Sequence, residues 1–177
     1  MKVVVLSGDG IGPEVIAEAR RVLAALLPDA ELEEMPFASD AIRRFGDPLP
    51  EETLSACKAA DAVLKAPVGD PEFDAKEIRP ELGVLRLRSA LDVYANLRPA
   101  RSMDSGRPVD LLIVRELVGG VYFGEKGVHE DGTVYDTCSY HPRDVERIAR
   151  RAFELARVRR RKLTSVDKAN EIGRAHV

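Results

Sequence analysis

The first third of the chain alternates between short apolar runs and segments with helical periodicity. Apolar runs predict three strands, over residues 3–6, 32–37 and 62–68. Helical spacing predicts three helices between them, over residues 14–27, 40–45 and 51–60. In the first helix five apolar residues share one face: Val15, Ala19, Val22, Leu23 and Leu26. This order of elements predicts an α/β fold with parallel strand pairing.

The pattern after residue 68 is less regular and predicts a mixture of loops, strands and two longer helices. Residues 118–140 alternate in "GVYFGE" and "TVYDT", which is typical of a β-hairpin or arm. The other expected elements are a loop at 68–80, a helix at 81–94, a strand at "NLRPARS", a loop at 102–108, a strand at 110–117, a basic helix at 143–161 and a strand at "KLTSVDKA". The loop at 102–108 is a candidate domain junction.

Composition places the chain among ordinary globular proteins of one or two domains. It has 177 residues, of which 45% are hydrophobic and 32% are charged. The net charge of −3 gives no general attraction to nucleic acid or membranes, and no apolar run approaches the ~20 residues of a membrane span. The first residues are not typical of a signal peptide, so we expect none, and Cys57 and Cys138 are typical of free thiols. We therefore expect a cytoplasmic protein without nucleic-acid or membrane partners.

The turn after the first strand raises the question of phosphate binding. Its glycines are Gly8, Gly10 and Gly12, whereas the dinucleotide fingerprint G-x-G-x-x-G requires the third glycine at the position of Pro13. Asp9 adds a negative charge where a pyrophosphate would approach, and no P-loop string occurs. The residues therefore favour a glycine corner that opens a helix, with the proline in its first turn.

Three arginines lie inside or beside apolar strings: Arg88, Arg98 and Arg115. Arginine is rarely buried without a partner, and its planar fork matches a carboxylate or a phosphate. The three side chains fit either a small anionic ligand or three separate salt bridges, and the pattern alone favours salt bridges.

Two further residues, Tyr122 and Lys168, are candidate proton carriers. Lone residues of these types are more often structural or solvated, although Lys168 lies near the end of a predicted strand, where ligands bind in α/β proteins. The basic run "RVRRRK" at 157–162 is interpreted as a solvated helix end rather than a nucleic-acid site. The histidines show no metal-ligand spacing.

Four ordered motifs together resemble the β-decarboxylating dehydrogenases, the family of 3-isopropylmalate and isocitrate dehydrogenases. They are "GDGIGPE", "LRLRSALDVYANLRPAR", "IVRELVGGVYFGE" and "SVDKAN". The resemblance covers roughly the first half of a family member. "RELVGGVYFGE" and the apolar pair Val84 and Leu85 are similar to the isopropylmalate branch, whereas "LKAPVGDP" at 64–71 is closer to other relatives.

The resemblance implies a two-domain α/β fold that differs from the Rossmann fold and is truncated here. Residues 1–98 would begin the cofactor-side domain and residues 99–170 the second, dimerisation domain, with a β-arm near 119–139. The implied cofactors are NAD and Mg²⁺ or Mn²⁺, with the metal ligands outside this fragment, and the implied assembly is a homodimer. The last seven residues, "EIGRAHV", fit no family pattern and match a translated sequencing adapter, so we expect a non-native tail.

The resemblance also implies substrate-binding roles for single residues. Arg88, Arg98 and Arg115 would clamp the carboxylates of a malate. Val84 and Leu85 would cradle its isopropyl group.

Four more residues receive catalytic or cofactor roles in the same way. Tyr122 would protonate the enol left by decarboxylation, and Lys168 would help to deprotonate the substrate hydroxyl in the partner subunit's site. Glu81 would lie beside the nicotinamide ring, and Ile11 would touch the cofactor.

The implied activity is oxidation and decarboxylation of 3-isopropylmalate with NAD, a step of leucine biosynthesis, with the fragment itself inactive. Tartrate, homoisocitrate or isocitrate dehydrogenase relatives are alternatives of the same class. An alternative of a different class is a non-catalytic module that binds a dicarboxylate.

Overall fold

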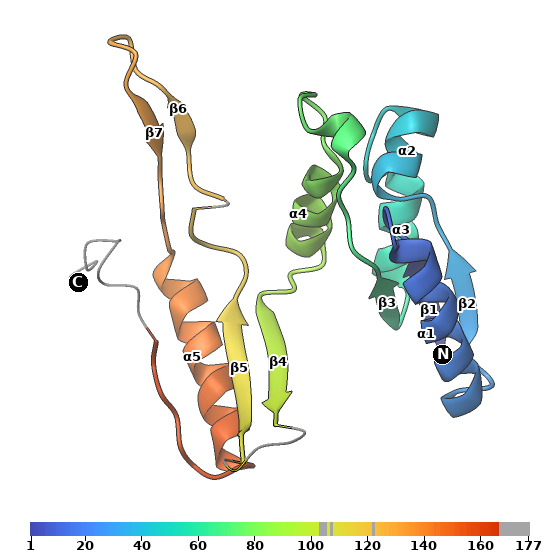
Figure 1. Cartoon of the computed structure of the whole chain (residues 1–177). Helices are drawn as coiled ribbons and strands as arrows, with labels where there is room; N and C mark the ends of the chain where they lie inside the picture. Colours follow the sequence, from blue (N-terminus) through green and yellow to red (C-terminus); the bar gives the residue numbers. More distant parts are fainter. Residues whose placement is uncertain (103–105, 107, 122, 167–177) are drawn as a thin grey trace. The chain divides into compact units, whose positions relative to one another are not determined.

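Three parallel strands form the centre of the first of two units into which the chain divides (Figure 1). The computed structural model describes residues 1–102, 106, 108–121 and 123–166. The first unit is Met1–Val93, and the second begins at Tyr94. The expected boundary after residue 98 would fall inside a strand of the second unit, Ala95–Arg101.

The first unit follows the predicted order of strands and helices. Its elements are β1 (Lys2–Leu6), α1 (Gly12–Leu26), β2 (Glu31–Glu34), α2 (Ala38–Phe45), α3 (Glu51–Ala59), β3 (Ala62–Lys65), a short 3₁₀ turn (Pro71–Phe73) and α4 (Pro80–Ala90). The sheet order is β2-β1-β3, with both neighbours parallel to β1. Parallel neighbours need crossover connections, which the helices supply. The α/β architecture predicted from the sequence is therefore confirmed.

The central strand β1 is covered on both faces, as its continuous apolar run predicts. Val4 and Leu6 belong to a core cluster with residues of α2, α3 and α4, such as Leu87, and with Leu49 from the connection between α2 and α3. Val5 points to the opposite face and packs with Ile16 of α1 and with Ala66. Each fully buried Leu or Val stabilises the fold by about 1.5–3 kcal/mol relative to exposure.

The helical pattern predicts the extent of α1 but not its buried face. The buried residues are Gly12 and Ile16, whereas Val15, Val22 and Leu26 are 46%, 58% and 72% exposed. The crossover from β1 to β2 fixes the side of the helix that meets the sheet. That side is rotated by about one residue from the most apolar stripe, so Val15, Val22 and Leu26 lie outward while Ala19 and Leu23 are half-buried.

Several predicted elements end earlier than expected. The strands over residues 32–37 and 62–68 stop at Glu34 and Lys65, because β1 offers only five residues for pairing. The helix over 81–94 stops at Ala90. Gly46, in the left-handed conformation with φ of 72°, ends α2 after Phe45, the residue where the predicted helix over 40–45 also ends.

The second unit contains two antiparallel strand pairs and one helix. Its elements are β4 (Ala95–Arg101), β5 (Asp110–Glu116), β6 (Lys126–Val128), β7 (Val134–Asp136) and α5 (Pro142–Arg157). β4 pairs with β5 along its whole length, and β6 pairs with β7 as a hairpin in the expected arm region (Figure 1). Helix α5 packs against β5.

Two expectations at the end of this unit are corrected. Residues 162–166 form no strand, and the rest of "KLTSVDKA" lies outside the described residues. A strand needs a partner for its backbone groups, and none pairs with this segment in the described part of the chain. The basic run is not purely solvated, because Arg159 forms an ion pair of 2.7 Å with Asp110 and Arg160 donates to the backbone oxygen of Asp110.

The two cysteines are free, as predicted, with Cys57 buried and Cys138 half-buried. Among the described residues, no helix is both long and apolar enough to cross a membrane.

Candidate functional site

The loops after β1 and β3 meet at the carboxyl edge of the parallel sheet, where α/β proteins bind ligands. The backbone N–H of Asp9 donates to the Pro67 carbonyl oxygen at 3.0 Å. Gly8 has φ of +65°, and a Cβ there would lie 2.1 Å from that same oxygen. Only glycine permits this approach, so at Gly8 the corner serves packing between loops, as its spacing predicts.

The carboxylate of Asp9 points into the protein and not toward a ligand. Its side chain is nearly buried, with the residue 8% exposed. Oδ1 accepts the backbone N–H of Ser39 at 3.0 Å, and Oδ2 accepts that of Gly69 at 3.0 Å. This one side chain therefore joins the first corner, the start of α2 and the loop after β3.

Helix α4 carries four of the predicted site residues. Glu81, Leu85 and Arg88 follow each other at helical spacing on one side of the helix. Val84 is 9% exposed and belongs to the apolar core, whereas Leu85 is half-buried. Glu81 is exposed, and its Oε1 lies 3.6 Å from the point where a Cβ of Gly69 would stand. The remaining predicted residue of this unit, Ile11, is 60% exposed before α1.

Lys65 joins this edge of the sheet, although the sequence argument assigned it no role. It is the last residue of β3, and its Nζ donates to the Ala66 carbonyl oxygen at 2.7 Å. Burial lowers the pKa of Lys65, and the positive charge of Arg88 lowers this pKa further, while Asp9 acts in the opposite direction. The sequence feature that could have identified Lys65 is its position as a cation at the end of an otherwise apolar strand.

The second unit carries the other two predicted arginines on one face of the β4–β5 pair. Asn96 lies directly opposite Arg115, and Arg98 lies opposite Ile113. Opposite residues of an antiparallel pair share a face, as do residues two apart on one strand, so Asn96, Arg98 and Arg115 lie together. The Nε–H of Arg98 donates to Oδ1 of Asn96 at 2.6 Å.

The salt bridges that the pattern alone favoured for the three arginines do not occur among the described residues. None of Arg88, Arg98 and Arg115 forms an ion pair there, although many other arginines do. Arg98 and Arg115 lie together in the second unit, and Arg88 belongs to the first.

The turn after β5 is held by hydrogen bonds to a carboxylate. The Glu116 carboxylate accepts the backbone N–H groups of Val118 at 2.7 Å and Gly119 at 2.9 Å. The ring of Tyr140 packs on the same turn, because a Cβ on Gly119 would lie only 2.7 Å from the ring. Burial raises the pKa of Tyr140. The sequence analysis did not identify these hydrogen bonds of Glu116, which lie shortly before Tyr122 in the chain. Both Tyr122 and Lys168 lie outside the described residues.

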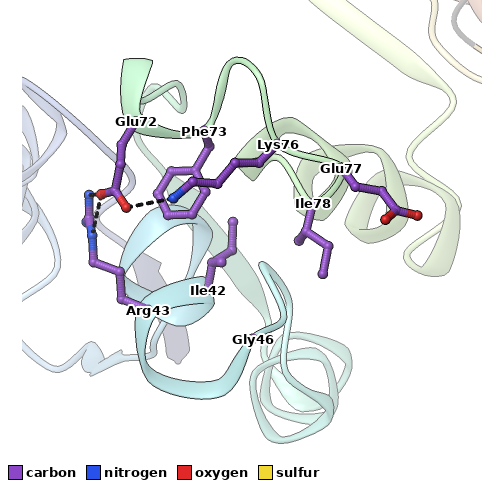
Figure 2. A pocket seen from close by; sticks show the side chains of 8 residues that line it. All are labelled: Ile42, Arg43, Gly46, Glu72, Phe73, Lys76, Glu77 and Ile78. Atoms are coloured by element: carbon purple, nitrogen blue, oxygen red, sulfur yellow. Dashed lines mark hydrogen bonds and ion pairs between the residues drawn. The ribbon is translucent and has the colours of Figure 1, made fainter.

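A surface pocket of about 430 Å³ lies between α2 and the segment after the 3₁₀ turn (Figure 2). Its charged side chains already bind one another: Arg43 forms ion pairs of 2.6 Å with Asp70 and with Glu72, and Lys76 lies 2.9 Å from Glu72. Lys76 and Arg43 hold the pKa of Glu72 below its usual range. No predicted site residue lines this pocket. Nor do the described residues contain a group of three side chains suited to bind a metal.

Comparison with known proteins assigns the chain to a family. Residues 2–175 match the family model described as isocitrate/isopropylmalate dehydrogenase. The chain belongs to this family. The resemblance of the four motifs and the implied fold of this family are thereby confirmed.

Many relatives of the chain carry the name of one enzyme, 3-isopropylmalate dehydrogenase. The chain is 49% identical over 188 residues to the 3-isopropylmalate dehydrogenase of Novosphingobium aromaticivorans. This alignment covers 96% of this chain and 53% of that protein. Identity to the same enzyme of Aquifex aeolicus is 46% over 190 residues, with 96% and 52% covered. The chain therefore spans about half the length of the curated relatives it matches.

Solved structures of the family agree with the fold. The isocitrate dehydrogenase of Methylococcus capsulatus superposes with a TM-score of 0.82 at 33% identity, covering 96% of this chain and 51% of that one. A β-decarboxylating dehydrogenase of Thermococcus kodakarensis gives a TM-score of 0.69 at 39% identity, covering 89% and 46%.

Proposed function

We propose that the protein containing this chain oxidises and decarboxylates 3-isopropylmalate with NAD, in leucine biosynthesis and in the cytoplasm. Relatives that are 42–49% identical carry the name of that enzyme. The observation that carries the proposal is the pair of guanidinium groups, Arg98 and Arg115, on one face without acidic partners among the described residues. Unpaired guanidinium groups are suited to bind carboxylates.

The substrate would be held by its carboxylates and by its alkyl tail. Arg98 and Arg115 of the second unit would each offer a planar guanidinium group to a carboxylate, and the family motifs give the same role to Arg88 of α4. Leu85, half-buried beside Arg88 on the helix surface, would contact the isopropyl group, with Val84 supporting it from the core. Burying such a tail contributes about 1.5–3 kcal/mol.

The catalytic steps are assigned from the family motifs. Tyr122 would protonate the enol, and Lys168 would take part in deprotonating the hydroxyl in the partner subunit's site of a homodimer. Glu81 and Ile11 are exposed and would contact NAD, which accepts the hydride when bound. The described residues offer no suitable cluster for Mg²⁺ or Mn²⁺, so we assign the metal ligands outside them and derive no step through the metal.

One observation favours the other branches of the family. Lys65 adds a positive charge near Arg88, at the edge of the sheet where the alkyl tail would lie. A second cation there suits a substrate with an additional polar or anionic group, as in isocitrate, homoisocitrate or tartrate. These acids are therefore the second candidate substrates.

The test uses the chain joined to the second half of the Aquifex aeolicus relative, with the unfused 177-residue chain in parallel. We expect the fusion to reduce NAD with isopropylmalate, followed by absorbance of the reduced nicotinamide, and the unfused chain to show no turnover. Preference for another acid would assign the other branch. Failure of the fusion with all four acids, while it binds isopropylmalate, would favour the non-catalytic binding module.

A matched pair of variants tests the clamp in the same fusion. Arg98→Lys replaces a planar fork with a point charge and should lower kcat/KM by about 10- to 100-fold, because a bond to a charged group contributes about 1.5–3 kcal/mol. Arg101→Lys, on the same strand but the opposite face, is the control and should leave kcat/KM unchanged. Equal effects of the two variants would contradict the clamp.

A further inference from the structure

Asn96 lies between the two arginines of the β4–β5 face. It is directly opposite Arg115 on the neighbouring strand, where opposite Cβ atoms are about 4.5–5.5 Å apart. It is also two residues before Arg98, whose Nε–H donates to its Oδ1 at 2.6 Å. Asn96 is half-buried, whereas both arginines are exposed. The most buried side chain of the three therefore bonds to one arginine and lies directly opposite the other.

The chemistry of the asparagine amide suits this place. An amide has one acceptor oxygen and two N–H donors. The oxygen is used by Arg98, and the Nδ2 donors have no protein partner among the described residues. Because the bond engages Nε–H, the two terminal nitrogens of Arg98 stay available as a fork. Fixing Nε–H also removes part of the rotamer freedom that arginine would otherwise lose on binding an anion.

We propose that Asn96 is the positioning residue of this face, which orients Arg98 so that Arg98 and Arg115 together bind one small dicarboxylate. An aspartate at this position would keep the acceptor but set a negative charge beside the ligand, and an alanine would release Arg98. This inference rests on the carboxylate clamp of the proposed function and adds the residue that organises it.

The experiment uses the 177-residue chain and malonate as the dicarboxylate probe. The Nε–H signal of Arg98 is followed by NMR, for its exchange with solvent and for its shift during a malonate titration. In Asn96→Ala we expect faster exchange and about three- to tenfold weaker malonate binding, the loss of one modest hydrogen bond. In Asn96→Asp the slow exchange should return while malonate binds more weakly still. If Asn96 had only a structural role, the variants would not show slow Nε–H exchange of Arg98 together with weakened malonate binding.

Arg101→Lys, on the opposite face, is the control and should leave malonate binding unchanged. Unchanged exchange and unchanged malonate affinity in Asn96→Ala would overturn the positioning role alone. If the parent chain shows no malonate-dependent shift of Arg98, this face does not bind dicarboxylates by itself and the inference fails. Turnover of isopropylmalate by the fusion would then still support the proposed function, so the two failures are distinguishable.

Discussion

Replacing Asp9 with alanine removes the side chain that joins three segments of the first unit. Its two oxygens accept the backbone N–H groups of Ser39 and Gly69, both at 3.0 Å. No other side chain in the described part of the chain bonds to these two amides, so the variant leaves both without their acceptor.

The two bonds do not contribute equally. A bond to an ionised acceptor contributes about 1.5–3 kcal/mol, and an unpaired buried N–H costs about 1–3 kcal/mol. Ser39 is 1% exposed, so water does not replace its lost partner. Gly69 is exposed, and water can bond to its amide after the substitution. The Ser39 bond therefore dominates, and we expect a total loss of about 2–4 kcal/mol.

Urea unfolding of the full chain, followed by circular dichroism at neutral pH, measures this loss. Asp29→Ala is the matched control, because Asp29 is exposed in the turn after α1 and should change the stability by less than about 0.5 kcal/mol. Asp9→Asn keeps one acceptor and should lie between the two. If Asp9→Ala costs no more than Asp29→Ala, the view that Asp9 joins the loops is refuted.

Two further predictions concern Lys65 and the arm. Burial and Arg88 lower the folded-state pKa of Lys65, so its charged form costs stability at neutral pH and this cost is relieved as the pH rises above that lowered pKa. Lys65→Met should therefore raise the Tm at neutral pH and flatten the rise of stability toward alkaline pH; a lower Tm with an unchanged slope would contradict this. The hairpin exposes Val128 by 67% and Val134 by 75%, and isolated hairpins are marginal in water, so we expect it to pair with a second copy. Deleting residues 127–137 in the fusion should give monomers by sedimentation, and intact dimers would disprove the arm's role.

Local chemistry in the sequence determined most of the elements of the first unit. The apolar run of β1 predicts a strand covered on both faces, and Gly46 predicts the end of α2. The spacing of Gly8, Gly10 and Gly12 predicts a glycine corner that opens a helix, and α1 begins at Gly12. These features depend on the residues themselves and on their nearest neighbours in the chain, so a single sequence contains the information. The family was also readable, because four motifs in a fixed order carry it.

Only the tertiary structure decided which side chains meet. Periodicity predicted a helix for α1 but only part of its packed side, because the crossover to the sheet and not the apolar stripe sets the side that packs. The sequence showed Asp9 only as a negative charge at the glycine corner, and the fold shows that its carboxylate accepts the backbone N–H groups of Ser39 and Gly69. The sequence also left Asn96 unnoticed, since its place opposite Arg115 depends on the register of two strands. Register and packing are properties of segments distant in the chain, and no local pattern records them.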